Sequence, residues 1–500
     1  MATSLEKPLR MLVLLLAGAP SAFAASVQVP VYFGIQPGSA TKAEVDLTLG
    51  EPRSRGEGMT YEYGPPPGVS DTARVTVTFF SDTMQVARLD VHLKAPLAPG
   101  PLRPQFGNRV MVRDRPGGGQ EEIFYPRLNG LVFDSKASDA PASAISYLSP
   151  RFVADLYVDR FNESRQGGRP DEARTEADKA VAVDPDYARG YSAQGAWLES
   201  QENYDEAIVR YLAATNARYS PKAKSRAHAH LGKLYWSRKA WPDKAEAELK
   251  RAVAVAPDLA FAHVSYGEFL LHQKRPDEAL VRFTRAIELA SNDIDARIGA
   301  AGIHWAKNEF AKARPHLEQA AAWLESPAGA KANPAFSFQV YFRLAYCLGE
   351  AKEHGRSLEV YLKAERFSPN DVALINNMAS NLLDLGQPEE AARKARAGLA
   401  LAPNDFFLNK TMGNALLALG RFEEALRHHQ AALAARPDDA WQFVNIARSW
   451  AALHKKKPAL EWLDKAVTAG LRCRSVLLTD PHFEWLRGNG DFKKLVARTS

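Results

Sequence analysis

Residues 406–439 read FFLNKTMGNALLALGRFEEALRHHQAALAARPDD, a stretch in which small residues stand at fixed places. Gly413, Ala425, Ala432 and Pro437 follow one another at intervals of 12, 7 and 5 residues. The same spacing returns about every 34 residues along most of the chain. A period of this length indicates stacked helical repeats before any individual residue is considered.

Each unit is expected to form two antiparallel helices of roughly 14 residues joined by a short turn. Small residues allow the two helix backbones to approach closely, whereas a Leu or Ile would push them apart. Because one such pair cannot bury its apolar face alone, neighbouring units must stack into a solenoid. The position four residues after the first Ala is expected to fill the gap against the next unit, and it usually holds a large side chain: Tyr211, Leu249, Phe283, Leu317, Tyr361 and Leu463.

This pattern resembles the tetratricopeptide repeat (TPR) family, whose units carry Gly, Ala, Ala and Pro at these places. The resemblance implies a mainly α-helical solenoid that binds other proteins. Two units depart from the pattern, with Phe161 in the Gly position and Ser357 in the first Ala position. An RNA-binding helical repeat with a slightly longer period is the nearest alternative, but the period and the Gly/Ala/Ala/Pro signature favour the TPR family. The nine units are 154–187, 188–221, 225–259, 260–293, 294–327, 338–371, 372–405, 406–439 and 440–473.

Two segments interrupt or end the repeats. Residues 328–337 break the period, and we interpret them as a joint between five units rich in aromatic residues and four units rich in amides. Residues 474–500 are predicted to form a C-terminal capping helix, because the last unit must cover its outer apolar face.

Residues 26–150 lack the helical period and are predicted to form a small α+β domain that precedes the solenoid. Thr41 and Glu44 form a capping box ahead of a short helix that ends near Gly50. Alternation of apolar and polar residues in 73–80 is typical of a half-covered strand. Further strands are predicted at 59–63, 85–93, 123–125, 131–134 and 144–148, with a hairpin turn at 81–84.

The layout of this region occurs twice. The motifs at 49–50 and 61–63 are echoed by similar residues at 106–107 and 123–125. This arrangement resembles the tandem helix-plus-sheet fold of β-lactamase inhibitory protein, whose single-copy relatives include outer-membrane assembly lipoproteins of the SmpA/OmlA type. The resemblance implies a sheet that serves as a protein-docking surface, although the chain lacks the lipid-anchor Cys of the lipoproteins. A small domain that caps the solenoid is the alternative.

Residues 1–24 have the features of a secretory signal peptide. Lys7 and Arg10 precede a short apolar stretch, and Ala22-Phe23-Ala24 is a small-x-small cleavage site. We therefore expect an exported protein, periplasmic or secreted, that is soluble after cleavage near Ala24 and has no stable membrane anchor.

The net charge and the cysteine content bear on two questions: whether the protein binds nucleic acid and whether it forms a disulfide. A net charge of +6 is modest for 500 residues and predicts no nucleic-acid partner. Cys347 and Cys473 lie almost four repeats apart, much further than the Cα separation of about 7 Å that a disulfide allows. No intramolecular disulfide is therefore expected, and Cys347 is predicted to be a small core residue.

The sequence contains no motif that predicts catalysis, a metal or a cofactor. The run Gly117–Gly119 lacks the Lys-Ser/Thr of a phosphate loop, so we expect a hairpin tip. His228 and His230 are two residues apart on a helix and do not share a face. An enzyme with its active site in the N-terminal domain is the alternative class. It would need a clustered acid and base where the sequence shows His92 and scattered acids.

Partner binding is predicted on the first helices of successive units, which line the inner surface of a solenoid. Positions 2, 5, 6, 9, 12 and 13 of each unit should face inward. In the last three units these positions hold amides and cations, which can bind an extended peptide backbone without reading its sequence. Part of this set resembles the carboxylate clamp of some family members, although the other cations of the clamp would need a further repeat. The predicted residues are Asn376, Asn377, Lys410, Asn414, Asn445 and Arg448.

Earlier units present aromatic residues toward the same surface, among them Trp305, Phe342 and Tyr346. These could be hot spots for a partner, or they could pack against adjacent helices. The sequence thus predicts an exported, non-catalytic scaffold that binds partner proteins or peptides in the groove of its solenoid. The alternative is a periplasmic co-chaperone or envelope-assembly factor that captures extended segments. The sequence fixes neither the partner nor the oligomeric state.

Overall fold

The computed structural model describes residues 35–56, 58–65, 72–97, 109–114, 120–124, 131–135, 142–218, 220–472 and 474–499. The predicted signal peptide, the Gly117–Gly119 run and Cys473 lie outside these residues. Contacts divide the chain between Phe269 and Leu270 into two compact units.

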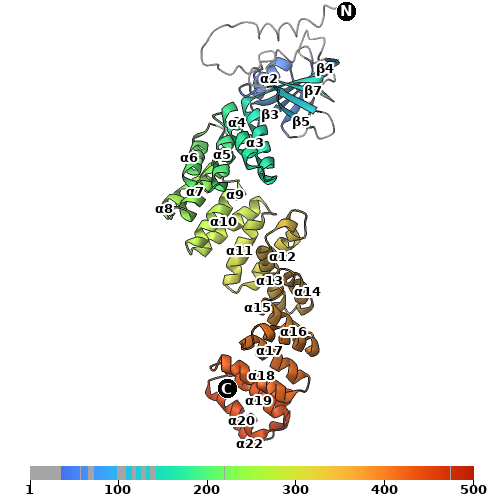
Figure 1. Ribbon diagram of the computed structural model, residues 1–500, viewed down its shortest axis with the longest axis vertical. Helices are drawn as coiled ribbons and strands as arrows, with labels where there is room; N and C mark the ends of the chain where they lie inside the picture. The colour runs from blue at the N-terminus through green and yellow to red at the C-terminus, as the bar shows by residue number, and fades with distance from the viewer. Residues whose placement is uncertain are drawn as a thin grey trace, which may run out of the picture. The chain divides into compact units, whose positions relative to one another are not determined.

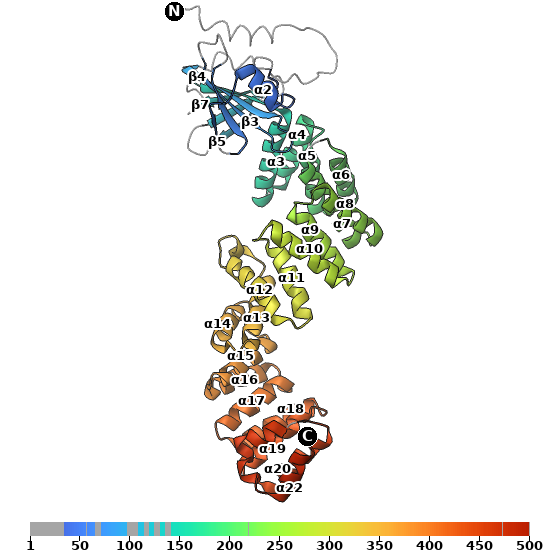
Figure 2. The same ribbon diagram turned by 180° about the vertical axis from the view of Figure 1, so that it is seen from behind.

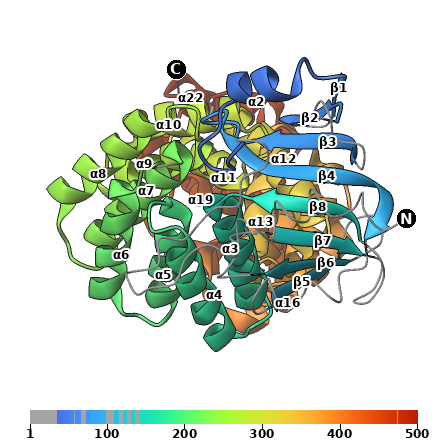
Figure 3. The same cartoon turned by 90° about the horizontal axis from the view of Figure 1, so that it is seen from above.

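The first unit begins with one helix and an antiparallel sheet (Figure 3). Eight strands of the described chain form the sheet, in the order β1-β2-β3-β4-β8-β7-β6-β5. The strands β1–β4 and β5–β8 are two consecutive meanders that join where β4 pairs with β8. The elements are α2 (Lys42–Leu49), β1 (Ser54–Arg55), β2 (Thr60–Tyr63), β3 (Thr72–Phe79), β4 (Val86–Leu97), β5 (Arg109–Asp114), β6 (Gln120–Phe124), β7 (Leu131–Ser135) and β8 (Ala142–Leu148).

The predicted helix start is confirmed at α2. The side chain of Thr41 accepts a hydrogen bond from the backbone of Glu44, whose carboxylate accepts one from the backbone N–H of Thr41, so both halves of the capping box are present. Gly50, with φ at +80°, ends the helix. Tyr63 of β2 donates to Asp46 of α2 over 2.8 Å and ties the helix to the sheet. The strands form two four-stranded halves, while the tandem helix-plus-sheet layout and the resemblance to β-lactamase inhibitory protein stay predictions.

Helical repeats fill the rest of the first unit, where they follow β8 after a single residue, Ser149 (Figure 1). Arg151, in the first turn of α3, joins the sheet region to the repeats. Its guanidinium donates to Asp82 over 2.8 Å and lies 4.0 Å from the ring centre of Phe80. The helices are α3 (Pro150–Gln166), α4 (Pro170–Val183), α5 (Ala188–Ser200), α6 (Tyr204–Asn216), α7 (Pro221–Ser237) and α8 (Pro242–Val255), followed by α9 (Ala260–His272), which spans the division.

The second unit is helical throughout its described residues (Figure 2). Together with the first unit it confirms the predicted mainly α-helical repeat fold preceded by a small α+β region. The segment predicted as one capping helix contains three short helical elements instead. The elements are α10 (Pro276–Leu289), α11 (Ile294–Ala306), α12 (Phe310–Leu324), η2 (Gly329–Lys331), α13 (Pro334–Glu350), α14 (His354–Glu365), α15 (Val372–Asp384), α16 (Pro388–Leu401), α17 (Phe406–Ala418), α18 (Phe422–Ala435), α19 (Ala440–Ala452), α20 (Lys456–Thr468), α21 (Arg474–Thr479), η3 (Pro481–Leu486) and α22 (Gly490–Ala497).

The glycine position exists because a large side chain of the same unit occupies the space beside it. A Cβ added to Gly232 would lie 2.5 Å from Cγ of Leu249, and one added to Gly195 would lie 2.9 Å from the ring of Tyr211. The large residue was predicted to fill the gap against the next unit, and it also packs within its own unit. In the unit with Phe161 the large and small side chains exchange places. Phe161 occupies the glycine position, Ala177 occupies the position of the large residue, and both are buried in one cluster.

The turn between the two helices of a unit has the same backbone in every unit of the predicted register. One residue there has a positive φ, which lets the first helix end and the second begin within a few residues. Three of these residues are glycines and the others are not: Gly168, Glu202, Ala240, Lys274, Asn308, Lys352, Gly386, Gly420 and His454.

Candidate functional site

The first helices of successive repeats lie against one another, so their outward side chains form a common surface. Direct contacts join α13 to α15, α15 to α17 and α17 to α19 in the second unit. Each of these helices also packs on the second helix of its own repeat. We call the exposed side of the first helices in the second unit the inner face.

The two amides of α15 on the inner face are engaged in internal hydrogen bonds. Asn376 accepts from the hydroxyl of Thr411 in α17 over 2.8 Å and donates to Asn377 over 3.3 Å. Asn377 in turn donates to the hydroxyl of Tyr361 over 3.1 Å. Both side chains are half-buried, and their bonds connect three successive repeats. These predicted binding residues therefore hold neighbouring repeats together.

Lys410 and Asn414 of α17 are the available polar pair of the predicted set. They are one helical turn apart and partly exposed. Among the residues that the structure describes, neither side chain has a hydrogen-bond or ion-pair partner. An ammonium and an amide that are free and adjacent can bind a carboxylate and a peptide group.

Asn445 and Arg448 of α19 were predicted to face a partner, and for Asn445 the structure corrects this. Asn445 is only 4% exposed, donates to Gln442 over 3.4 Å and accepts from Arg448 over 2.8 Å. The guanidinium of Arg448 forms an ion pair with Asp480, at the start of η3. The reason is the C-terminal segment, which follows the last repeat in place of a further one and supplies Asp480 as the partner of the Arg448 guanidinium.

Asp480 is held in its charged form by this arrangement. Burial alone would raise the pKa of its carboxyl group, but hydrogen bonds from His482 and the charge and hydrogen bond of Arg448 lower the pKa to about 2. The side chain also accepts from the backbone N–H of His482 over 2.9 Å, which starts the η3 segment. Arg448 therefore stabilises the end of the repeat array.

Two exposed aromatic residues on the same helices were missed by the sequence interpretation. Phe407, in the first turn of α17, is 45% exposed, and Trp441, in the first turn of α19, is 43% exposed. Both occupy the second position of their units, one of the predicted inward positions. In these units the sequence prediction named the polar residues at the other inward positions. The guanidinium of Arg436 lies 4.5 Å from the ring centre of Phe407.

The three predicted aromatic residues of earlier units lie against other side chains. Trp305 and Tyr346 contact each other and Phe310 edge to face, with ring centres 5.1 to 5.2 Å apart. Phe342 packs on Phe338, with ring centres 5.5 Å apart, and on the ring of Tyr361. All three are half-buried beside one apolar cluster. They are less exposed than Phe407 and Trp441.

A buried histidine lies beneath Lys410 and Arg448. The ring of His429 is fully buried beside Gly413, and neither of its nitrogens has a hydrogen-bond partner in the described part of the chain. Burial, with the positive charges of Arg448 and Lys410 nearby, lowers the pKa of His429 to about 3. The imidazole is therefore neutral, and it adds no charge to the inner face at neutral pH.

Family models for the tetratricopeptide repeat match residues 158–223, 231–294, 270–333 and 309–447, which together make up more than half of the chain. The chain belongs to the TPR family. TPR domains bind other proteins or peptides, and the family's repeats are generally non-catalytic scaffolds. No curated protein matches the chain.

Solved structures similar to this TPR protein include three in which the match covers most of the solved chain. MamA residues 41 to the end from Desulfovibrio magneticus RS-1 is 17% identical, covers 35% of this chain and 94% of its own, and has a TM-score of 0.31. YrrB, described as a TPR protein with an unusual peptide-binding site, is 21% identical, with coverages of 44% and 91% and a TM-score of 0.24. The TPR domain of P58(IPK) is 16% identical, with coverages of 61% and 89% and a TM-score of 0.24.

The described residues contain no group of three or more His, Cys, Asp or Glu side chains arranged to hold a metal ion. None of their helices combines the length and the apolar character that a membrane span requires. Cys347 is a buried free thiol.

Proposed function

We propose that this TPR protein is a non-catalytic scaffold whose inner face at α17 and α19 binds an extended peptide. The observation that carries the proposal is the position of Lys410 and Asn414 beside the exposed ring of Phe407 on one helix. An unpaired cation next to exposed aromatic side chains is typical of an interface hot spot.

The chemistry of the site specifies the kind of peptide. Lys410 suits a carboxylate, and the amide of Asn414 suits a backbone N–H or C=O group. Phe407 and Trp441 suit an apolar side chain near that carboxylate. The occupant is therefore an extended segment in which an acidic group stands next to a Leu, Phe or similar residue. An acidic side chain and a peptide C-terminus both supply this carboxylate.

The test is a binding assay with the full chain. Fluorescently labelled peptides that contain an acidic residue beside Phe or Leu, either internally or at the C-terminus, are titrated and followed by fluorescence polarisation. Lys410→Ala and Trp441→Ala should each weaken binding by about tenfold, the value of one good hot-spot contact. Lys493→Ala, which removes an exposed lysine of α22, is the matched control and should have no effect.

Two other outcomes of the binding assay would contradict the proposed site or the proposed kind of peptide. If binding survives in Lys410→Ala but Phe342→Ala abolishes it, the aromatic repeats bind the partner and the proposal for α17 and α19 is wrong. Neutral peptides that bind as tightly as acidic ones would instead favour the alternative function, a co-chaperone or envelope-assembly factor that captures extended segments through its amides.

We further propose that the chain is exported and acts in the periplasm or outside the cell. This rests on the charged start, apolar stretch and Ala22-Phe23-Ala24 site of residues 1–24. Expression of the full chain in a bacterial host, fractionation and N-terminal sequencing test the proposal. A mature protein that begins at Ala25 in the exported fraction supports it, and an intact Met1 in the cytoplasm contradicts it.

A further inference from the structure

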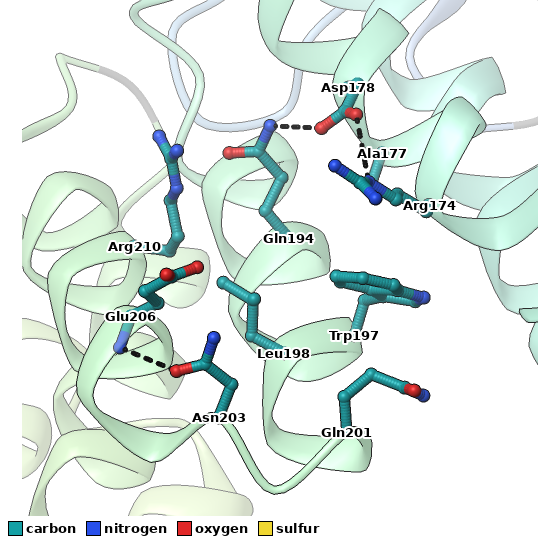
Figure 4. Close-up of a pocket in the computed structure, with 10 residues that line it drawn as sticks. All are labelled: Arg174, Ala177, Asp178, Gln194, Trp197, Leu198, Gln201, Asn203, Glu206 and Arg210. Carbon is teal, nitrogen blue, oxygen red and sulfur yellow. Dashed lines mark hydrogen bonds and ion pairs between the residues drawn. The ribbon is translucent and has the colours of Figure 1, made fainter. Parts of the chain in front are cut away.

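In the first unit of the chain, a pocket of about 380 Å³ lies on the side of the repeats that carries their second helices (Figure 4). It is formed between the second helices α4 and α6, and the first helix α5 forms its floor. This outer pocket is distinct from the inner face. Its lining is Arg174, Ala177, Asp178, Gln194, Trp197, Leu198, Gln201, Asn203, Glu206 and Arg210.

The floor of the outer pocket contains an unsatisfied acceptor. The amide nitrogen of Gln194 donates to the carboxylate of Asp178 over 2.8 Å, and this fixes the orientation of the amide because a carboxylate can only accept. The amide oxygen of Gln194 consequently points the other way. Among the residues that the structure describes, this oxygen has no hydrogen-bond partner. Figure 4 shows this oxygen on the side of the pocket where Arg210 stands.

The rim of the outer pocket carries two opposite charges that are unpaired in the described part of the chain. Glu206 and Arg210 are exposed and lie one turn apart on α6. In the described chain neither side chain takes part in an ion pair, with the other or with a third group. Asp178, in contrast, is already engaged by Gln194 and by Arg174.

A second pocket, in the second unit of the chain, occupies the same place in its own repeats and serves as an internal comparison. It lies between α14 and α16 over α15 and has a volume of about 360 Å³. Glu390 and Lys394 there stand at the repeat positions of Glu206 and Arg210. Both are neutralised, Glu390 by Arg393 and Lys394 by Glu365.

The outer pocket lacks both neutralising groups. Val209 stands at the repeat position of Arg393, and Val181 stands at that of Glu365. The floor of the outer pocket is also more polar than that of the second pocket, since Gln194 stands at the repeat position of Met378. The outer pocket therefore presents a free cation, a free anion and a free acceptor, where its counterpart has paired charges over an apolar floor.

We propose that the outer pocket binds a free α-amino acid in its zwitterionic form. The guanidinium of Arg210 receives the carboxylate, while the carboxylate of Glu206 and the amide oxygen of Gln194 accept hydrogen bonds from the ammonium group. Trp197, which donates its ring N–H to Pro170, and the buried Leu198 supply an apolar wall for the side chain. A pocket of this size with a few convergent polar groups has room for such a ligand.

The test is ligand-observed saturation-transfer NMR with the full chain and the twenty common L-α-amino acids as probes. At least one amino acid should receive saturation, and its N-acetyl and amide derivatives should lose the signal because each lacks one of the two charges. Arg210→Gln and Glu206→Gln should each weaken binding by about tenfold. Gln194→Met, which installs the residue of the second pocket, should also weaken it. Glu390→Gln, the equivalent change in the second pocket, should leave binding unchanged.

Two outcomes would overturn the proposal. One is the absence of saturation transfer to every amino acid at millimolar concentration, with circular dichroism showing a folded protein. The other is binding that persists in both Arg210→Gln and Glu206→Gln, which would place the ligand elsewhere. Since none of these substitutions lies on the inner face, peptide binding by Lys410 is unaffected, and the two proposals can fail independently.

Discussion

Replacement of Ser357 by Ala should destabilise the protein, although Ala is the usual residue of that repeat position. The Ser357 side chain is fully buried in α14, and its hydroxyl donates to the carbonyl of Ala345 over 2.6 Å. The same hydroxyl accepts from the amide of Asn381 in the next repeat, also over 2.6 Å. Asn381 is 6% exposed, so water cannot replace the hydroxyl without a local opening.

The magnitude follows from what Ser357→Ala leaves behind. A buried donor without a partner costs about 1–3 kcal/mol. The higher helix propensity of Ala returns about 0.5 kcal/mol. The net effect is a loss of about 1–2 kcal/mol in the free energy of unfolding. An argument from the repeat consensus alone predicts the opposite sign, so the experiment separates the two.

Urea unfolding of the full chain, followed by circular dichroism, measures the effect. Ser357→Ala should lower the midpoint, and Ser357→Ala combined with Asn381→Leu should recover most of the loss because the orphaned amide is gone. The matched control is Ala391→Ser, the same position in the next repeat, where Ala415 corresponds to Asn381 and offers no donor. This control should be destabilised by its buried hydroxyl. An unchanged or higher midpoint for Ser357→Ala would refute the reasoning.

Three further substitutions test the packing and the turns by thermal or urea unfolding of the full chain. His429→Leu should remove a pH dependence: the wild type loses about 1.4 kcal/mol per pH unit as pH falls from about 6.5 toward 3, because the unfolded histidine takes up a proton that the buried one, with a pKa of about 3, does not. A parallel slope in both proteins would contradict the assignment. Gly232→Ala should cost about 1–3 kcal/mol, since its Cβ would lie 2.5 Å from Leu249, and no loss would show that the helices can separate. Lys352→Gly should stabilise the protein by about 0.5–1 kcal/mol because Gly adopts the φ of +60° at this position without strain. A lower melting temperature would show that the conformational entropy that Gly loses on folding outweighs this relief.

The sequence predicted the repeat fold because its decisive residues act locally. The capping box at Thr41 and the small residues beside Leu249 and Tyr211 need only their own unit to be interpreted. Six of the eight described strands of the N-terminal sheet were predicted from the sequence to within a few residues, whereas β1 and β5 were missed. It did not predict the left-handed turn residues, since most of them are not glycines and a Glu or Lys carries no turn signal. The pairing of β4 with β8 depends on residues far apart in the chain and could not be derived from alternation.

The candidate site was harder to predict because its side chains depend on neighbouring units. Position 6 is predicted to face inward in every repeat. The structure shows that Asn377 at this position is bonded to the Tyr361 hydroxyl of the preceding repeat, while Asn445 at the same position is turned toward Arg448. The partner of Arg448 is Asp480, which belongs to no repeat. A position in the repeat therefore specifies a place on the backbone but not whether the side chain is available.

Availability to a ligand follows from what the adjacent repeats supply. Lys410 has no ion-pair partner among the described residues, whereas Lys394 is paired with Glu365 of the preceding repeat. Arg210, at the repeat position of Lys394, is unpaired in the described chain, and Val181 stands at the position of Glu365. At this repeat position, one residue of the preceding unit decides whether a cation stabilises the array or can bind a ligand. Substitutions at these neighbouring positions should therefore create or remove binding sites without changing the residues that contact the ligand: Val181→Glu should neutralise Arg210 and close the outer pocket to anions.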